Sequence, residues 1–150
     1  TIESLIPDFK GKKEDIQQII NVAPEVVSHN IETVRRLSKK VRIQAKYDRS
    51  LQTLSFLNKE GIRTKSGIML GLGESQEEVI ETMKDLMEVG VSIITFGQYL
   101  QPTKKHLEVL EFILPKQFDK YKQIALTYGF KHVESGPLVR SSYHAEKHIL

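Results

Sequence analysis

Glycines that end helix-like segments and lead into short apolar runs are the feature that most constrains the fold of this chain. Such junctions occur at Glu60-Gly61-Ile62, Gly90-Val91 and Gly129-Phe130. Glycine is favoured directly after a helix because that position often takes a left-handed backbone conformation. Each junction therefore predicts a helix followed by a strand, and their repetition predicts an α/β fold with parallel strands.

The expected helices and strands alternate along most of the chain. The clearest helix covers residues 75–89, with Ser75 and Glu78 spaced as a capping box. Another begins at Pro115, since proline is favoured in a first helical turn. We expect further helices at 12–21, 31–38 and 50–60, and strands at 2–6, 26–28, 68–70, 93–96 and 131–134. An open doubly wound sheet and part of a (β/α) barrel both fit this pattern.

Composition narrows the class of protein. The chain has 150 residues, 39% hydrophobic and 27% charged, as in an ordinary globular domain. The net charge of +3 is small and the basic residues are dispersed, so no nucleic-acid partner is indicated. No apolar run reaches the roughly 20 residues of a membrane span, and the first residues do not resemble a signal peptide. We therefore expect no membrane partner and a cytoplasmic location.

The chain contains no cysteine. This excludes disulfides, cysteine zinc sites and a thiol nucleophile within the chain. It also excludes a complete cysteine-ligated iron–sulfur site.

Four polar segments follow expected strands, at the positions where parallel sheets and barrels bind ligands. They cover residues 28–33, 65–74, 97–103 and 135–146. In the first segment, Asn30 and Glu32 suit a ribose diol, although Asn30 or Thr33 could instead cap the next helix, with His29 a hydrogen-bonded residue near the core. In the second, the glycines allow a ligand to approach the backbone, but they fit a tight turn equally well.

The third segment lies in a long stretch, residues 97–114, that predicts a functional or covering loop. Gln98, Tyr99 and Gln101 there suit the orientation of a polar substrate, whereas the basic residues 104–106 favour a solvated face. In the fourth segment, Arg140 and the two serines that follow it suit phosphate binding, or belong to a surface tail.

In order, these segments contain H-N-x-E-T, T-K-S-G-x-M-x-G-L-G-E, G-Q-Y-L-Q-P-T and G-P-x-V-R-S-S-Y-H-A. Together they resemble the lipoyl synthase family of radical SAM enzymes, over nearly the whole chain. The resemblance implies insertion of two sulfur atoms at C6 and C8 of a protein-bound octanoyl-lysine. It also implies S-adenosylmethionine (SAM) and two four-iron four-sulfur (4Fe-4S) clusters as cofactors, one of them consumed as the sulfur source.

The fold implied by the resemblance is a partial (β/α)6 barrel. Residues 1–150 would form its later βα units, with residues 136–150 as a closing tail and the first strand as an exposed edge. The amino-terminal half of the family, with its cysteine motifs C-x-x-x-C-x-x-C and C-x4-C-x5-C, is absent from this chain. We therefore expect this chain alone to be inactive.

The resemblance also implies roles for individual residues. Asn30 and Glu32 would hold the SAM ribose, and the backbone around Met69 and Gly71 would meet the adenine. Ser141, with Ser142 as the alternative, would be the serine ligand to the sacrificial cluster. The candidate residues for binding substrate are Arg49, Tyr99, Gln101 and Arg140.

The implied partners are octanoylated lipoyl carrier proteins, namely the lipoyl domains of 2-oxoacid dehydrogenases and the glycine-cleavage carrier protein. An electron donor such as flavodoxin or ferredoxin is also implied. Two alternatives remain. One is a biotin-synthase-like enzyme, which the R-S-S-Y-H-A segment disfavours; the other is a cysteine-free, non-catalytic module that binds SAM or lipoyl carrier domains.

Overall fold

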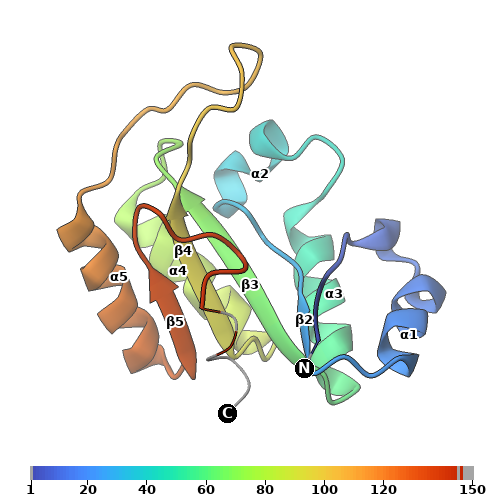
Figure 1. The fold of residues 1–150 in the computed structure, drawn as a ribbon. Coiled ribbons are helices and arrows are strands. Elements are labelled where there is room, and N and C mark those ends of the chain that lie inside the picture. Colours follow the sequence, from blue (N-terminus) through green and yellow to red (C-terminus); the bar gives the residue numbers. More distant parts are fainter. Residues whose placement is uncertain (1, 145, 147–150) are drawn as a thin grey trace.

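One parallel sheet forms the centre of the computed structural model, which describes residues 2–144 and residue 146 (Figure 1). Its strands are β1 (Glu3–Leu5), β2 (Val26–Ser28), β3 (Arg63–Leu70), β4 (Ile93–Gln98) and β5 (His132–Ser135). The helices are α1 (Lys13–Asn21), α2 (Arg35–Val41), α3 (Tyr47–Lys59), α4 (Gln76–Glu88) and α5 (Pro115–Tyr128), with a short 3-10 helix, η1 (Phe9–Gly11). The α/β fold with parallel strands is confirmed.

The strand order distinguishes between the two architectures that the sequence allows. The strands lie in the sheet in the same order as along the chain, β1-β2-β3-β4-β5, and this order does not reverse at any point. Because parallel crossovers are right-handed, an order without reversal places the connecting helices on one face. In Figure 1, α4 lies behind the sheet while the segment after β5 turns back across its front. The arrangement is an arc of a (β/α) barrel, and β1, which pairs only with β2, forms its edge among the described residues.

The two faces of the sheet differ in chemistry because side chains alternate along a strand. On the outer face, Ile68 and Phe96 belong to a buried cluster with residues of α4 and α5 such as Met83 and Phe118. A smaller cluster joins β1 and β2 to α1 and α3 through Ile6, Ile16, Val27 and Leu57. The inner face of β3 instead presents Lys65, Gly67 and Met69. A polar or small inner face leaves room for a pocket.

The strongest sequence signals for helix boundaries are confirmed. Ser75 Oγ accepts a hydrogen bond from the Glu78 N–H (3.3 Å), and the Glu78 carboxylate accepts one from the Ser75 N–H (2.8 Å). Helix α5 begins with Pro115 and ends before Gly129, whose φ of 102° lies in the left-handed region.

Three predicted boundaries are wrong. The helix expected at 31–38 is α2, which begins only at Arg35, because Glu32 pairs with β3: its N–H donates to the Gly67 carbonyl (2.9 Å) and its carbonyl accepts from the Met69 N–H (2.8 Å). The N-cap of α2 is Val34 and makes no side-chain cap, so capping by Asn30 or Thr33 is also wrong. The helix expected from residue 50 begins at Tyr47, and the strand expected from residue 68 begins at Arg63.

Candidate functional site

A pocket of about 420 Å³ opens between the ends of β2, β3 and β4 and the segment that follows β5. Its volume falls within the range of about 300–1,000 Å³ typical of small-molecule sites. Five of the residues predicted from sequence to bind cofactor, substrate or cluster line it: Asn30, Glu32, Met69, Arg140 and Ser141. With Gly97, the first residue of the third motif, the fold brings residues from all four motifs around one cavity.

Glu32 is held in an unusual backbone conformation at the pocket wall. Its φ is 68°, in the left-handed region that non-glycine residues rarely adopt. Its N–H and carbonyl are both bonded to β3, and this pairing holds the conformation in place. Such strain is concentrated at functional sites. Burial raises the pKa of the Glu32 carboxyl, against the lowering effects of the Arg42 charge and a hydrogen bond from Asn30.

Asn30 supplies the pocket with a hydrogen-bond acceptor that the protein itself does not use. Its Oδ1 is buried and has no partner among the described residues. Buried polar atoms are almost always paired, so such an atom lining a cavity indicates a ligand donor. The neighbouring Gly67 keeps this space open, since a Cβ there would lie 2.7 Å from Thr95 Oγ1 and 3.0 Å from Asn30 Oδ1.

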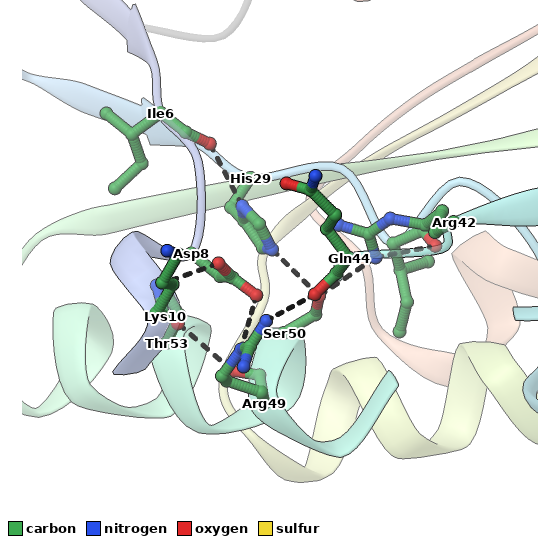
Figure 2. Close-up of polar contacts among 10 residues, drawn as sticks. Ile6, Asp8, Lys10, His29, Arg42, Gln44, Arg49, Ser50 and Thr53 are labelled. Carbon is green, nitrogen blue, oxygen red and sulfur yellow. Dashed lines mark hydrogen bonds and ion pairs between the residues drawn. The ribbon is translucent and has the colours of Figure 1, made fainter. Parts of the chain in front are cut away.

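A chain of hydrogen bonds holds Arg42 beside the pocket (Figure 2). Arg42 Nη1 donates to Ser50 Oγ (2.9 Å) and to the Ile31 carbonyl (3.2 Å). His29 Nε2 lies 2.8 Å from Ser50 Oγ, and His29 Nδ1 lies 2.9 Å from the Ile6 carbonyl oxygen. Since a carbonyl only accepts, Nδ1 bears the proton and Nε2 accepts from the Ser50 hydroxyl.

This series of hydrogen bonds explains the positions of both His29 and Arg42. Burial lowers the pKa of His29, which keeps the imidazole neutral. His29 is thus the hydrogen-bonded residue near the core that the sequence allowed. Arg42 lines the pocket, and its positive charge interacts with the Glu32 carboxyl. Arg42 was not identified as a site residue from the sequence. It follows a helix rich in Lys and Arg, so no local pattern marks it.

A second pocket, of about 310 Å³, shares Asn30, Glu32 and Arg42 with the first. Arg49 lines it, with Nε 2.6 Å from Asp8 Oδ2 and Nη2 donating to the Gln44 carbonyl (2.6 Å), as Figure 2 shows. Burial acts to raise the pKa of Asp8, but the Arg49 hydrogen bond, the Lys10 N–H and the Arg49 charge outweigh it, so that pKa is lowered. The predicted role of Arg49 in binding substrate stays a prediction.

Three predicted site residues lie outside the lining of the main pocket and hold the loop after β4 instead. Tyr99 Oη donates to the Leu107 carbonyl (2.9 Å), and Gln101 Nε2 donates to the His106 carbonyl (2.8 Å). Gly71 donates its N–H to the Glu74 carboxylate (2.6 Å), and its carbonyl accepts from the Leu110 N–H (2.8 Å). Their roles toward substrate or adenine stay predictions.

Gln98 also holds the loop after β4 in place through hydrogen bonds. Its Nε2 donates to the carbonyls of Tyr99 and Glu111, both at 3.0 Å, and its Oε1 accepts from the Ile113 N–H (2.9 Å). These bonds occupy an amide that the sequence offered as a substrate contact. The stretch expected to be a covering loop is thus tied to the end of β4.

The closing tail forms the remaining wall of the pocket. Arg140 Nη1 donates to the Val139 carbonyl (2.7 Å), and Ser141 lines the pocket, whereas Ser142 is exposed and does not. Of the expected tail, 136–150, residues 145 and 147–150 lie outside the described residues. Ser141 is therefore better placed than Ser142 to face a bound group.

Thiolate ligands for an iron–sulfur cluster do not come from this chain, which has no cysteine. In residues 2–144 and 146, no group of three or more His, Asp or Glu side chains is placed to hold a metal ion. Over the same residues, no helix has the length and apolar character needed to cross a membrane.

A pocket at the strand ends of a parallel barrel arc is typical of a class of ligand-binding enzymes, and comparison with known proteins identifies the class to which this chain belongs. The Radical SAM superfamily model matches residues 1–86, and the chain belongs to this superfamily. The sequence is 66% identical to the lipoyl synthase of Flavobacterium psychrophilum over 151 residues, covering 100% of this chain and 52% of that protein.

A second relative is also a lipoyl synthase. Identity to the mitochondrial lipoyl synthase of Nematostella vectensis is 64%, covering 99% of this chain and 52% of that protein. The chain thus spans about half the length of the curated relatives it matches. Among solved structures, Streptococcus suis SuiB bound to S-adenosylmethionine superposes with a TM-score of 0.72 at 14% identity, covering 95% of this chain and 35% of SuiB. That similarity supports the fold.

Proposed function

We propose that this chain is the SAM-binding and pocket-closing part of a lipoyl synthase, which inserts two sulfur atoms at C6 and C8 of an octanoyl group on a lipoyl carrier protein. Identity of 66% to a lipoyl synthase along the whole chain supports the proposal. The structural observation that carries it is the buried, unpartnered Asn30 Oδ1 beside the Glu32 carboxyl in one pocket.

The residues present fit SAM. A ribose diol has two hydroxyl donors, and Asn30 Oδ1 and the Glu32 carboxylate are acceptors held on one wall of the pocket. Met69, on the inner face of β3, would lie against the adenine. SAM bound here would supply the radical chemistry that removes hydrogen from C6 and C8. The positive charge of Arg42 favours the charged form of the Glu32 carboxyl and so opposes the rise in its pKa that burial causes.

The two 4Fe-4S clusters need thiolates from a part of the protein outside this chain, since the chain contains none. Ser141 is the residue of this chain proposed to ligate the sacrificial cluster. It follows that the isolated chain is inactive. The proposed partners are octanoylated lipoyl domains and the glycine-cleavage carrier protein, with flavodoxin or ferredoxin as electron donor.

The test uses the full-length protein with reconstituted clusters, SAM, a reductant and an octanoylated lipoyl domain. Mass spectrometry should show a lipoyl group on the carrier lysine. Glu32→Gln should weaken SAM binding about tenfold or more, since a hydrogen bond to a charged group contributes about 1.5–3 kcal/mol. Glu88→Gln, on the exposed end of α4, is the matched control and should bind SAM normally. Absence of lipoyl product from the unaltered protein would overturn the proposal.

The absence of cysteine favours one other candidate, a non-catalytic module that binds SAM or lipoyl carrier domains. The intact mass and the upstream coding sequence separate the two. Finding both cysteine motifs upstream of Thr1 would support the enzyme. Finding neither motif there would support the non-catalytic module.

A further inference from the structure

Lys65 is a fully buried lysine on the inner face of β3, with 0% of its side chain exposed. Its Nζ lies 2.9 and 3.1 Å from the two carboxylate oxygens of Glu3 on β1, and it also donates to the carbonyl of Ser141 in the closing tail. Ser28 Oγ, on the intervening β2, donates to the same carboxylate (2.8 Å). Buried lysines are rare and need partners. This one connects three adjacent strands to the tail.

The tail after β5 approaches the sheet closely at Gly136, Val139 and Ser141. The Gly136 N–H donates to the Phe96 carbonyl (3.1 Å), and the Val139 N–H donates to the Gly136 carbonyl (3.1 Å). A Cβ on Gly97 would collide with the Val139 carbonyl oxygen, so glycine at this position lets the tail backbone lie directly on β4. Val139, Arg140 and Ser141 then line the pocket, and Ser141 is where the tail reaches β3.

We infer that the Glu3–Lys65 ion pair anchors residues 139–141 over the pocket, which makes Lys65 a positioning residue for that wall. An ammonium has three N–H donors, so it can hold the carboxylate and the tail carbonyl together. Opening the tail would remove the Ser141 carbonyl from a charge already buried, and this cost favours the closed position. The anchor rests on the proposed function only in taking SAM as the ligand of the pocket.

Two variants of the full-length protein test the anchor. Lys65→Met removes the ammonium while keeping most of the length of the unbranched side chain. Glu3→Leu/Lys65→Met removes both charges, so that no carboxylate is left buried without its partner, and replacing a buried ion pair by apolar residues is often neutral for stability. Lys39→Met, at an exposed position of α2, is the control.

Hydrogen exchange of peptides covering residues 139–143 reads the position of the tail, with α4 as an internal reference for folding. In both variants we expect exchange at 139–143 to become at least about tenfold faster while α4 stays protected. The dissociation constant for SAM, measured by calorimetry, should rise at least about tenfold. Lys39→Met should match the unaltered protein in both measurements.

Unchanged exchange at 139–143 in the folded double variant would refute the anchor. Faster exchange with unchanged SAM affinity would overturn the role of Lys65 in forming the pocket wall. If Lys65→Met loses protection throughout, the double variant decides. If the unaltered protein binds no SAM, the proposed function fails, and the exchange data still decide the anchor.

Discussion

Adding one methyl group at Gly67 should weaken SAM binding without disturbing the sheet. Gly67 lies in β3 with a backbone conformation open to alanine, and its α-carbon faces the pocket. An alanine Cβ there would lie 2.7 Å from Thr95 Oγ1 and 3.0 Å from Asn30 Oδ1. Both separations are shorter than ordinary van der Waals contact, so the two side chains must move. Asn30 bears the acceptor proposed to bind the ribose.

The size of the effect follows from crowding and from the displaced hydrogen bond. Inserting a methyl group into a packed site typically costs about 1–3 kcal/mol. If that cost falls on the bound state, the dissociation constant for SAM rises about 5- to 150-fold. Isothermal titration calorimetry of the full-length Gly67→Ala protein measures this, alongside thermal unfolding as the check on folding.

A second substitution separates the two contacts. Gly67→Ala/Thr95→Ala removes the clash with the threonine but leaves the one with Asn30, so most of the affinity loss should persist. Gly67→Ala binding SAM within twofold of the unaltered protein, with normal unfolding, would refute the placement of the ribose against Asn30.

Three further predictions concern the tail, the buried histidine and the loop. Ser141→Ala in the full-length protein should abolish lipoyl product, measured by mass spectrometry, while Ser142→Ala should not; an active Ser141→Ala would contradict the ligand role. Because burial lowers the pKa of His29 from its ordinary 6.5, the unfolded chain takes up the proton first as pH falls. The contribution of His29 to stability is therefore full above pH 6.5 and is lost below it, by up to about 1.4 kcal/mol per pH unit. Urea unfolding of the apo-protein at several pH values should show this slope, and His29→Gln should flatten it. Gln98→Ala removes hydrogen bonds worth about 1–3 kcal/mol in total, so limited proteolysis should cut residues 99–114 faster; an unchanged cutting rate would show that other contacts hold the loop.

The sequence by itself determined the features that depend on neighbouring residues. The capping box at Ser75, the proline start of α5 and the glycine stop at Gly129 were predictable because caps and left-handed glycines act within one helical turn. The polar segments after the strands were visible for the same reason, and the resemblance of their motifs to a family pointed to five of the twelve residues that line the pocket.

Only the tertiary structure decided the features that depend on distant residues. Glu32 leaves the expected helix because β3 supplies its backbone partners. Gln98, the last residue of β4, and Tyr99, directly after it, bind the loop rather than the pocket because that loop folds back onto them. Lys65 looks like an ordinary surface lysine until Glu3, 62 residues earlier, and the tail carbonyl close around it. Local patterns show which groups a chain offers, and long-range packing determines which of them remain free for a ligand.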